Sequence, residues 1–513
     1  MPGYRAIVGH FTLFLLLMNP QPAQATDASL VNGEVGLYPV GFRLYADRDG
    51  ARTFACPIRP DGDAFAPGRP VRIYIWYPAQ DSDRGRLLIR DYIQMAADDF
   101  GLRGENSEPV LPVQLMKGLD DEPLAALLNV KTMAVQGAEP ESCPFPLIIL
   151  GQGLYYESPF THYALCESLA GHGYVVATCP LMGTHARLVN INAVDLETQI
   201  RDMEFVLSKA RELPFVDSEE LGVIGYDLGG MAGLILSMRN LDVDAFLSLD
   251  SGILFPHYSG LPNTHPNYDE NRFVIPWLHV TQARFGQGEP SRGDPSSLMD
   301  RKRFGDSYLY LAETFNHGDF TSYAAFRITK AVPGYWSSPT NDSELLHEQI
   351  CLAGREFFDA YLKDDGDALS RLQTMPGDPA VSRAFPEMIH KPGQPRHPHP
   401  DDIVQEIIEK GFEAARPTIL EARKTYPDSL LFREPFINWL GYHFLYWWGR
   451  ESEAVEVFKL NTEIFPQSAN AFDSLGEAYS FTGNREKAIE SYRRSLELNP
   501  ENQNAREILE QLD

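Results

Sequence analysis

Positive charge is the first thing that this sequence lacks. Its 513 residues contain 44 lysines and arginines but 71 aspartates and glutamates, which gives a formal net charge of −27. Binding to nucleic acid needs a basic face against the phosphates, and an anionic membrane surface repels the same negative charge. We therefore expect no nucleic-acid partner. Apolar residues make up an ordinary 43 % of the chain, so a globular protein with a sizeable core is predicted.

Long apolar runs are missing too, apart from one near the N-terminus. That run, FTLFLLLM at 11–18, is too short to cross a bilayer comfortably. Arg5 precedes it and the small residues AQA at 23–25 follow it, which is the pattern of a cleaved secretory signal. We expect residues 1–25 to be removed, no membrane span to remain, and the protein to be exported to the periplasm or the exterior. A retained membrane anchor or a disordered tail is the alternative.

Cysteine is scarce, with only five residues in the chain. An oxidising compartment permits disulfides, but an odd number leaves at least one thiol unpaired in a monomer. No C-x-x-C or Cys/His metal spacing occurs, so we expect neither a metal nor another cofactor. Most of these cysteines are expected to be small core residues, and one pair could be bridged. The five are Cys56, Cys143, Cys166, Cys179 and Cys351.

The middle of the chain alternates short apolar runs with helical patterns. Strands are predicted at 69–79, 145–153, 174–180, 220–227, 243–250, 275–282 and 307–317. Helices are predicted at 160–173, 195–213, 229–240 and 344–364. This alternation indicates βαβ units and a mostly parallel sheet flanked by helices. We place this α/β domain at 26–390, with 80–142 as an excursion rather than core strands.

The C-terminal part of the chain has a different pattern. Residues 391–402 are rich in proline and polar side chains, which is typical of a linker. Residues 469–500 fit the tetratricopeptide (TPR) pattern of paired helices. The matching positions are Phe472, Leu475, Gly476, Tyr479, Ala488, Tyr492 and Pro500. We expect an all-α domain of TPR-like repeats at 403–513.

A second copy of the repeat precedes this one, with a turn that we expect to be one residue longer. Its matching positions are Leu440, Gly441, Phe444, Ala454, Phe458 and Pro466. A degenerate helix pair at 403–427 comes before both copies, and 502–512 is expected to cap the stack. An unrelated helical bundle is the alternative, which the shared glycine, alanine and proline positions disfavour. Because such stacks bind peptides or other chains, we expect a protein or peptide partner here.

The stretch LGVIGYDLGGMAG at 221–233 has the form of a hydrolase elbow with an unusual apex. In a G-x-S-x-G elbow the nucleophilic serine sits on a sharp strand-to-helix turn that only small neighbours permit. Gly225 and Gly229 meet that need, and Gly230 lets the following helix pack closely. The apex residue is Asp227, and no G-x-S-x-G occurs anywhere in the chain.

An acid and a histidine should follow such an elbow, at the ends of later strands. Asp250 ends the next predicted strand and His317 follows a further one. The order Asp227, Asp250, His317 is therefore nucleophile, acid, base, and the carboxyl ends of parallel strands meet where ligand clefts form. Simpler roles are a turn cap for Asp250 and a loop position for His317. Asp319 is a competing acid.

These motifs resemble the α/β-hydrolase superfamily over residues 34–365, and within it dienelactone-hydrolase-like and platelet-activating-factor-acetylhydrolase-like enzymes. GYDLGG is similar to their G-x-S-x-G-G, LSLDSGILFP to their acid segment and NHGDFTS to their histidine segment. The resemblance implies ester or lactone hydrolysis through an acyl-enzyme. It also implies an oxyanion hole made by the backbone N–H of Leu228 and one from the turn at Gln152, Gly153 and Leu154.

Asp227 is the departure from that family pattern, and it leaves three functions open. The first is a hydrolase-fold protein without ordinary serine-esterase activity. An aspartate that attacked an ester carbonyl would form a reactive anhydride and would have to expel an alkoxide, which is unfavourable. At saturated carbon the ionised carboxylate is a good nucleophile. An active hydrolase of an epoxide or alkyl halide is thus the second possibility, although Leu228 stands where the dehalogenases that it would resemble have tryptophan. The third is a binding or scaffold protein that works through the repeats.

The segment 253–305 is a possible lid over this site. Epoxide hydrolases use lid tyrosines to hold the opening oxygen, and the candidates by position are Tyr155, Tyr156, Tyr258 and Tyr268. If side chains of the lid fill the pocket, an inactive site becomes the better interpretation. Asp227 and Asp250 would then flank His317 and favour its charged form. A small-molecule ligand or substrate remains possible in either case.

Overall fold

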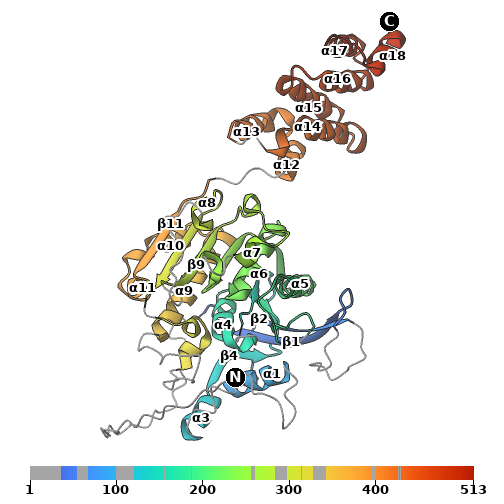
Figure 1. The fold of residues 1–513 in the computed structure, drawn as a ribbon. Helices are drawn as coiled ribbons and strands as arrows, with labels where there is room; N and C mark the ends of the chain where they lie inside the picture. The colour runs from blue at the N-terminus through green and yellow to red at the C-terminus, as the bar shows by residue number, and fades with distance from the viewer. Residues whose placement is uncertain are drawn as a thin grey trace, which may run out of the picture. The chain divides into compact units, whose positions relative to one another are not determined.

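The computed structural model describes residues 36–54, 68–99, 121–154, 158–185, 188–255, 260–283, 297–313, 315–326, 343–394, 400–425, 427 and 429–512. Contacts divide the chain into two compact units, one that ends at Gln394 and one that begins at Pro395 (Figure 1). The predicted signal at 1–25 and Cys56 lie outside the described residues. None of the helices in the described ranges is long and apolar enough to cross a membrane.

The first unit is built on one sheet of eleven strands, in the order β11-β10-β9-β8-β7-β5-β6-β2-β1-β4-β3. The strands are β1 (Val40–Asp49), β2 (Arg69–Pro78), β3 (Arg86–Leu88), β4 (Lys131–Gln136), β5 (Phe145–Gly151), β6 (Val175–Thr178), β7 (Val216–Tyr226), β8 (Ala245–Leu249), β9 (Trp277–Gln282), β10 (Ser307–Ala312) and β11 (Glu387–Lys391). The neighbours from β6 to β10 all pair in parallel, whereas β2 is antiparallel to both β1 and β6. The carboxyl ends of six successive parallel strands therefore meet at one edge.

Helices cover both faces of this sheet. They are α1 (Ile89–Asp99), α3 (Asp121–Leu128), α4 (Tyr163–Gly171), α5 (Ala193–Ala210), α6 (Leu228–Arg239), α7 (Gly260–Asn263), α8 (Leu298–Arg301), α9 (Ser343–Leu362), α10 (Gly366–Thr374) and α11 (Pro379–Ala384). Successive side chains of a strand point to opposite faces. Ile148 accordingly packs in one apolar cluster with α4 and α9, and Ile149 packs in another with α5 and α6. Burial on both faces explains the uninterrupted apolar runs of the sequence.

Two segments differ from the sequence-based expectation. The stretch 80–142 contributes β3 and β4 near one edge of the sheet, although we expected an excursion there. β4 has exposed Lys131 and Gln136 at its ends, so it lacks the apolar run of a core strand. At the other edge β11 pairs with β10, and Gln394 still belongs to the first unit. The linker prediction of 391–402 therefore began too early.

The second unit consists of helices packed as antiparallel pairs around their own apolar cluster. They are α12 (Pro400–Lys410), α13 (Phe412–Thr425), α14 (Glu434–Tyr442), α15 (Glu451–Ile464), α16 (Ala469–Phe481), α17 (Arg485–Leu498) and α18 (Gln503–Leu512). Close packing explains the repeat glycines. A Cβ on Gly441 would lie 2.6 Å from the Phe458 ring, and one on Gly476 would lie 3.0 Å from the Tyr492 ring.

The extra residue of the earlier repeat lies in its first helix and not in its turn. α14 continues as a π-helix over His443–Trp447, and the chain then turns through Gly449, which has φ +63°. The later repeat turns in the same way through Gly483, with φ +77°, directly after a regular α-helix. The prediction of a longer turn was wrong, because a π-helix absorbs an inserted residue without moving the turn.

The predicted fold class is confirmed. The first unit has a mostly parallel sheet with helices on both faces, which is the α/β-hydrolase fold, and the second is an all-α TPR-like domain.

Candidate active site

Asp227 stands at a strained turn between β7 and α6. Its backbone has φ 50° and ψ −115°, a conformation that costs a residue with a side chain about 1–3 kcal/mol. The surrounding glycines make the turn possible. A Cβ on Gly225 would lie 2.3 Å from the carbonyl oxygen of Gly229, and one on Gly229 would lie 2.2 Å from that of Gly151. The sharp elbow that the sequence predicted is present.

The end of β8 holds this turn in place. The backbone N–H of Asp227 donates to the carbonyl of Leu249 at 3.0 Å. The carbonyl of Asp227 accepts a hydrogen bond from the Ser251 hydroxyl at 2.8 Å. These contacts fix the direction in which the Asp227 side chain leaves the elbow.

Asp250 is bonded tightly to His317. Its Oδ2 lies 2.6 Å from His317 Nδ1, and its side chain is 1 % exposed. The Thr281 hydroxyl and the Gln282 backbone N–H donate to Oδ1, and the Gln282 side chain donates to Oδ2. Burial opposes ionisation, but the hydrogen bond and charge of His317 outweigh it and hold the pKa of Asp250 below its usual value. Asp250 is therefore a buried carboxylate, whereas the competing Asp319 accepts from the backbone of Asn316.

His317 is oriented by Tyr226 as well as by Asp250. The two rings stack with centroids 4.7 Å apart, and the Tyr226 hydroxyl donates to the His317 carbonyl at 2.9 Å. Burial lowers the pKa of His317, but the hydrogen bond to Asp250 and the charges of Asp250 and Asp227 raise it above the usual value overall. Sequence reasoning missed Tyr226, although its place directly before the apex residue was a signal.

The Asp227 carboxylate occupies the donors that the sequence assigned to an oxyanion hole. Its Oδ2 accepts from the backbone N–H of Leu154 at 2.9 Å, and the N–H of Leu228 also bonds to the carboxyl group. Burial raises the pKa of Asp227, and these two donors and His317 offset the rise only in part. A Cβ on Gly153 would lie 2.7 Å from Asp227 Cβ, which explains the glycine there.

Asp227 and His317 face each other without a hydrogen bond. Asp227 Oδ1 lies 4.0 Å from His317 Nε2, and the two side chains keep 23 % and 25 % exposure. The structure thus brings together all three residues of the predicted triad at the carboxyl edge of the sheet.

A layer of polar side chains supports the turn that carries Leu154. Gln152 donates to the Thr178 hydroxyl at 2.9 Å, and its carbonyl accepts from Gln199 of α5 at 2.6 Å. His162 packs edge-on against Tyr226, with centroids 4.9 Å apart. Burial lowers the pKa of His162 to about 3, so its ring is neutral beside the triad.

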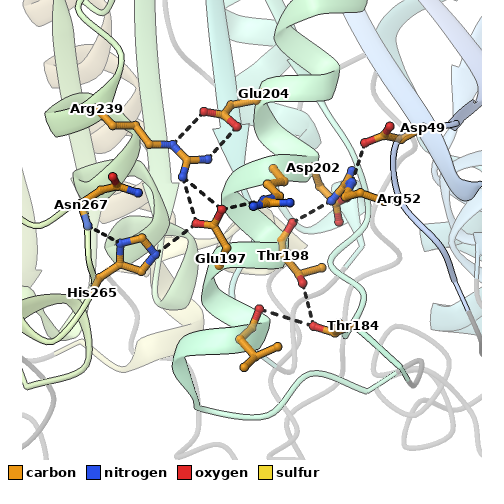
Figure 2. Close-up of polar contacts among 12 residues, drawn as sticks. Asp49, Arg52, Thr184, Glu197, Thr198, Asp202, Glu204, Arg239, His265 and Asn267 are labelled. Carbon is orange, nitrogen blue, oxygen red and sulfur yellow. Dashed lines mark hydrogen bonds and ion pairs between the residues drawn. The ribbon is translucent and has the colours of Figure 1, made fainter.

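Part of the possible lid is tied to α5 through His265, beside ion pairs that join α5 to α6 (Figure 2). His265 Nε2 lies 3.1 Å from a Glu197 carboxylate oxygen, and Arg239 bonds to both Glu197 and Glu204. An open cavity of about 700 Å³ lies beside this network, with Arg52 and Asn267 in its walls. Arg52 is paired with Asp49 and Asp202, so its charge is compensated within the protein.

The remaining candidates stay outside the triad. Tyr268 donates its hydroxyl to Glu270, and Tyr155, Tyr156 and Tyr258 lie outside the described residues. The cysteines that the structure describes, Cys143, Cys166, Cys179 and Cys351, are free thiols. Within the described ranges no group of three His, Cys, Asp or Glu side chains could hold a metal ion.

Comparison with known proteins adds a repeat family and a likeness to solved structures. Residues 469–502 match the tetratricopeptide repeat model. The chain is similar to a solved ferulic acid esterase from Streptomyces cinnamoneus, with 21 % identity and a TM-score of 0.48, over 70 % of this chain and 98 % of that one. No curated protein matches the chain.

Proposed function

We propose that this is an exported protein whose hydrolase domain does not hydrolyse esters by the serine route and whose repeats bind a protein partner. We further infer that the first domain is related to dienelactone-hydrolase-like or platelet-activating-factor-acetylhydrolase-like enzymes. The single observation that supports the loss of esterase function is the place of Asp227 Oδ2. It accepts the Leu154 N–H that a substrate carbonyl oxygen would need.

Serine-type hydrolysis needs two features that are absent when aspartate stands at the apex. A hydroxyl must attack the carbonyl carbon, and free N–H donors must stabilise the oxygen as it gains charge. Each such donor is worth about 10²–10³ in rate. Here the apex has no hydroxyl, and the donors already bind a carboxylate. The site is therefore suited to hold a polar small molecule without turnover.

The direct test of this proposal is the turnover of nitrophenyl esters by the purified protein. We expect the wild-type chain and Asp227→Ala to release nitrophenolate at the same background rate, because neither has an apex hydroxyl. A wild-type rate that Asp227→Ala abolishes would overturn the proposal. N-terminal sequencing of the secreted chain tests export separately, with Thr26 as the expected first residue.

One observation favours a second function, hydrolysis at saturated carbon. Asp227 Oδ1 faces His317 Nε2 and the side chain is partly open to solvent. The carboxylate can attack an electrophilic carbon, forming an alkyl ester while halide leaves or an epoxide oxygen opens and takes a proton from water. His317 then takes a proton from a second water, which attacks the ester carbonyl, and the alcohol leaves as Asp227 is regenerated.

The covalent intermediate gives this second function its own test. His317→Gln should stop the second step, so a bromoalkane or epoxide should add its mass to the peptide that contains Asp227. Asp227→Asn in the same background is the matched control and should carry no label. Absence of label across a panel of both substrate classes would exclude this function.

A further inference from the structure

We propose that a surface on the repeat domain, formed by Tyr442, Tyr446, Glu477 and Phe481, binds a lysine or arginine side chain of a partner polypeptide. This aromatic–acidic surface rests on the proposed function, which gives the repeats a protein partner, and adds the chemistry of that partner.

The surface is built by the first helices of the two clear repeats. The Tyr442 and Tyr446 rings stack with centroids 5.9 Å apart and an interplanar angle of 5°. Phe481 of α16 stands edge-on to Tyr446, with centroids 5.4 Å apart. Tyr446 and Phe481 are 49 % and 50 % exposed, which is costly for large rings and typical of residues that a partner covers.

Glu477 supplies a carboxylate among these rings, without a cationic partner. The hydroxyls of Tyr442 and Tyr446 donate to its two oxygens. Asp473, one turn earlier on α16, accepts only from the neutral amides of Asn502 and Asn504. Among the described residues, no lysine, arginine or histidine forms an ion pair with either carboxylate.

Four other acidic side chains of the same domain form ion pairs with lysine or arginine. Glu453, Glu456, Glu463 and Glu497 pair with Arg450, Lys459, Arg416 and Arg494 respectively. Glu477 differs from these four because its carboxylate lies among aromatic rings and no cation of the described residues pairs with it. Aromatic faces attract cations through their quadrupole, and a nearby carboxylate adds a direct Coulomb attraction. A positively charged side chain meets both features at once.

The local backbone is a second reason to expect function here. Tyr446 belongs to the π-helix at His443–Trp447, which the later repeat does not have. Single π-helical turns of this kind occur frequently at functional sites. A second copy of this chain is a poor occupant, because the net charge of −27 makes two copies repel each other.

The test uses the full chain and three labelled decapeptides, with glycine alternating with lysine, serine or glutamate. We expect only the lysine peptide to bind, with an affinity that falls as salt screens the attraction. Tyr446→Ala and Glu477→Gln should each weaken that binding about tenfold. Circular dichroism melting checks that both variants fold, and Tyr446→Phe, which keeps the ring, should lose less than Tyr446→Ala.

Glu463→Gln is the matched control, because it also removes one negative charge from the repeat domain but at a residue paired with Arg416. It should change the affinity less than twofold, and equal losses in Glu463→Gln and Glu477→Gln would overturn the proposal. Tyr446-dependent binding of the serine or glutamate peptide would keep the repeats as a binding domain but overturn a cationic partner. Binding of no peptide, or a change of oligomeric state in Tyr446→Ala, would overturn it as well.

Discussion

The two carboxylates that flank His317 differ in how closely they keep the hydrolase pattern. Asp250 is fully buried, lies 2.6 Å from His317 and accepts three further hydrogen bonds. Asp227 is partly exposed, lies 4.0 Å from the other ring nitrogen and accepts a hydrogen bond from the backbone N–H of Leu154. The protein thus has a buried acid–histidine pair beside an apex residue that carries a carboxylate and no hydroxyl. A triad-like geometry is not by itself evidence for the reaction.

Replacing Asp250 and Asp227 by asparagine, one at a time, should give the largest difference in unfolding free energy between the two sites. Asp250→Asn puts an N–H group against donors that already point at it, and breaking a buried pair of this kind costs about 3 kcal/mol of unfolding free energy. Asp227→Asn should cost less than about 1 kcal/mol, because solvent reaches that side chain. Urea unfolding of the two variants measures the difference. Equal losses would contradict the distinction between a buried pair and an open apex.

Tyr226→Phe probes the support of His317 from the elbow side. It removes the hydroxyl that donates to the His317 carbonyl but keeps the ring that stacks on the imidazole. We expect a loss of about 1 kcal/mol, the worth of one hydrogen bond. Thermal unfolding measures it. Tyr226→Phe should also shift the NMR resonance of the His317 ring. Tyr268→Phe is the control for that shift, because it removes a hydroxyl that is bonded to Glu270, away from the triad.

The smallest expected effect is a dependence on pH that separates His317 from His162. His317 has a raised pKa, so its pair with Asp250 adds stability below about pH 6.5 that is lost as the pH rises through the folded value. The lowered pKa of Asp250 makes the same stability disappear on acidification below about pH 4. The difference in stability between wild type and His317→Gln should therefore be largest near pH 5.

NMR titration of the two histidines checks the cause directly. The His317 ring should gain its proton above about pH 6.5, whereas His162, with a pKa of about 3, should stay neutral from pH 5 to 9. A His317 pKa below its usual value would contradict an ion pair between His317 and Asp250.

The fold and the proximity of Asp227, Asp250 and His317 were predictable from the sequence because each rests on a strong local signal. The parallel strands carry uninterrupted apolar runs, and Gly225 and Gly229 mark an elbow that tolerates no side chain. β4 was missed because a short strand with exposed polar ends gives no such run. The direction of the Asp227 carboxylate was not predictable, since it depends on where the backbone of Leu154 lies after folding.

The π-helix of the repeat domain could not be predicted from the sequence either. The pattern revealed one extra residue between Gly441 and Ala454, but helix and turn accommodate an insertion equally well in the sequence. Only the matching left-handed turns at Gly449 and Gly483 assign the extra residue to the helix.

Replacement of Asp227 by serine tests the central claim most directly. Asp227→Ser frees the N–H groups of Leu154 and Leu228 and places a hydroxyl beside a histidine that Asp250 already orients. If the apex alone blocks ester hydrolysis, this variant should release nitrophenolate from nitrophenyl acetate at least about 10²-fold faster than wild type, the usual worth of a positioned general base. Asp227→Ala should show no such gain. A serine variant that stays folded and no faster than wild type would contradict the account.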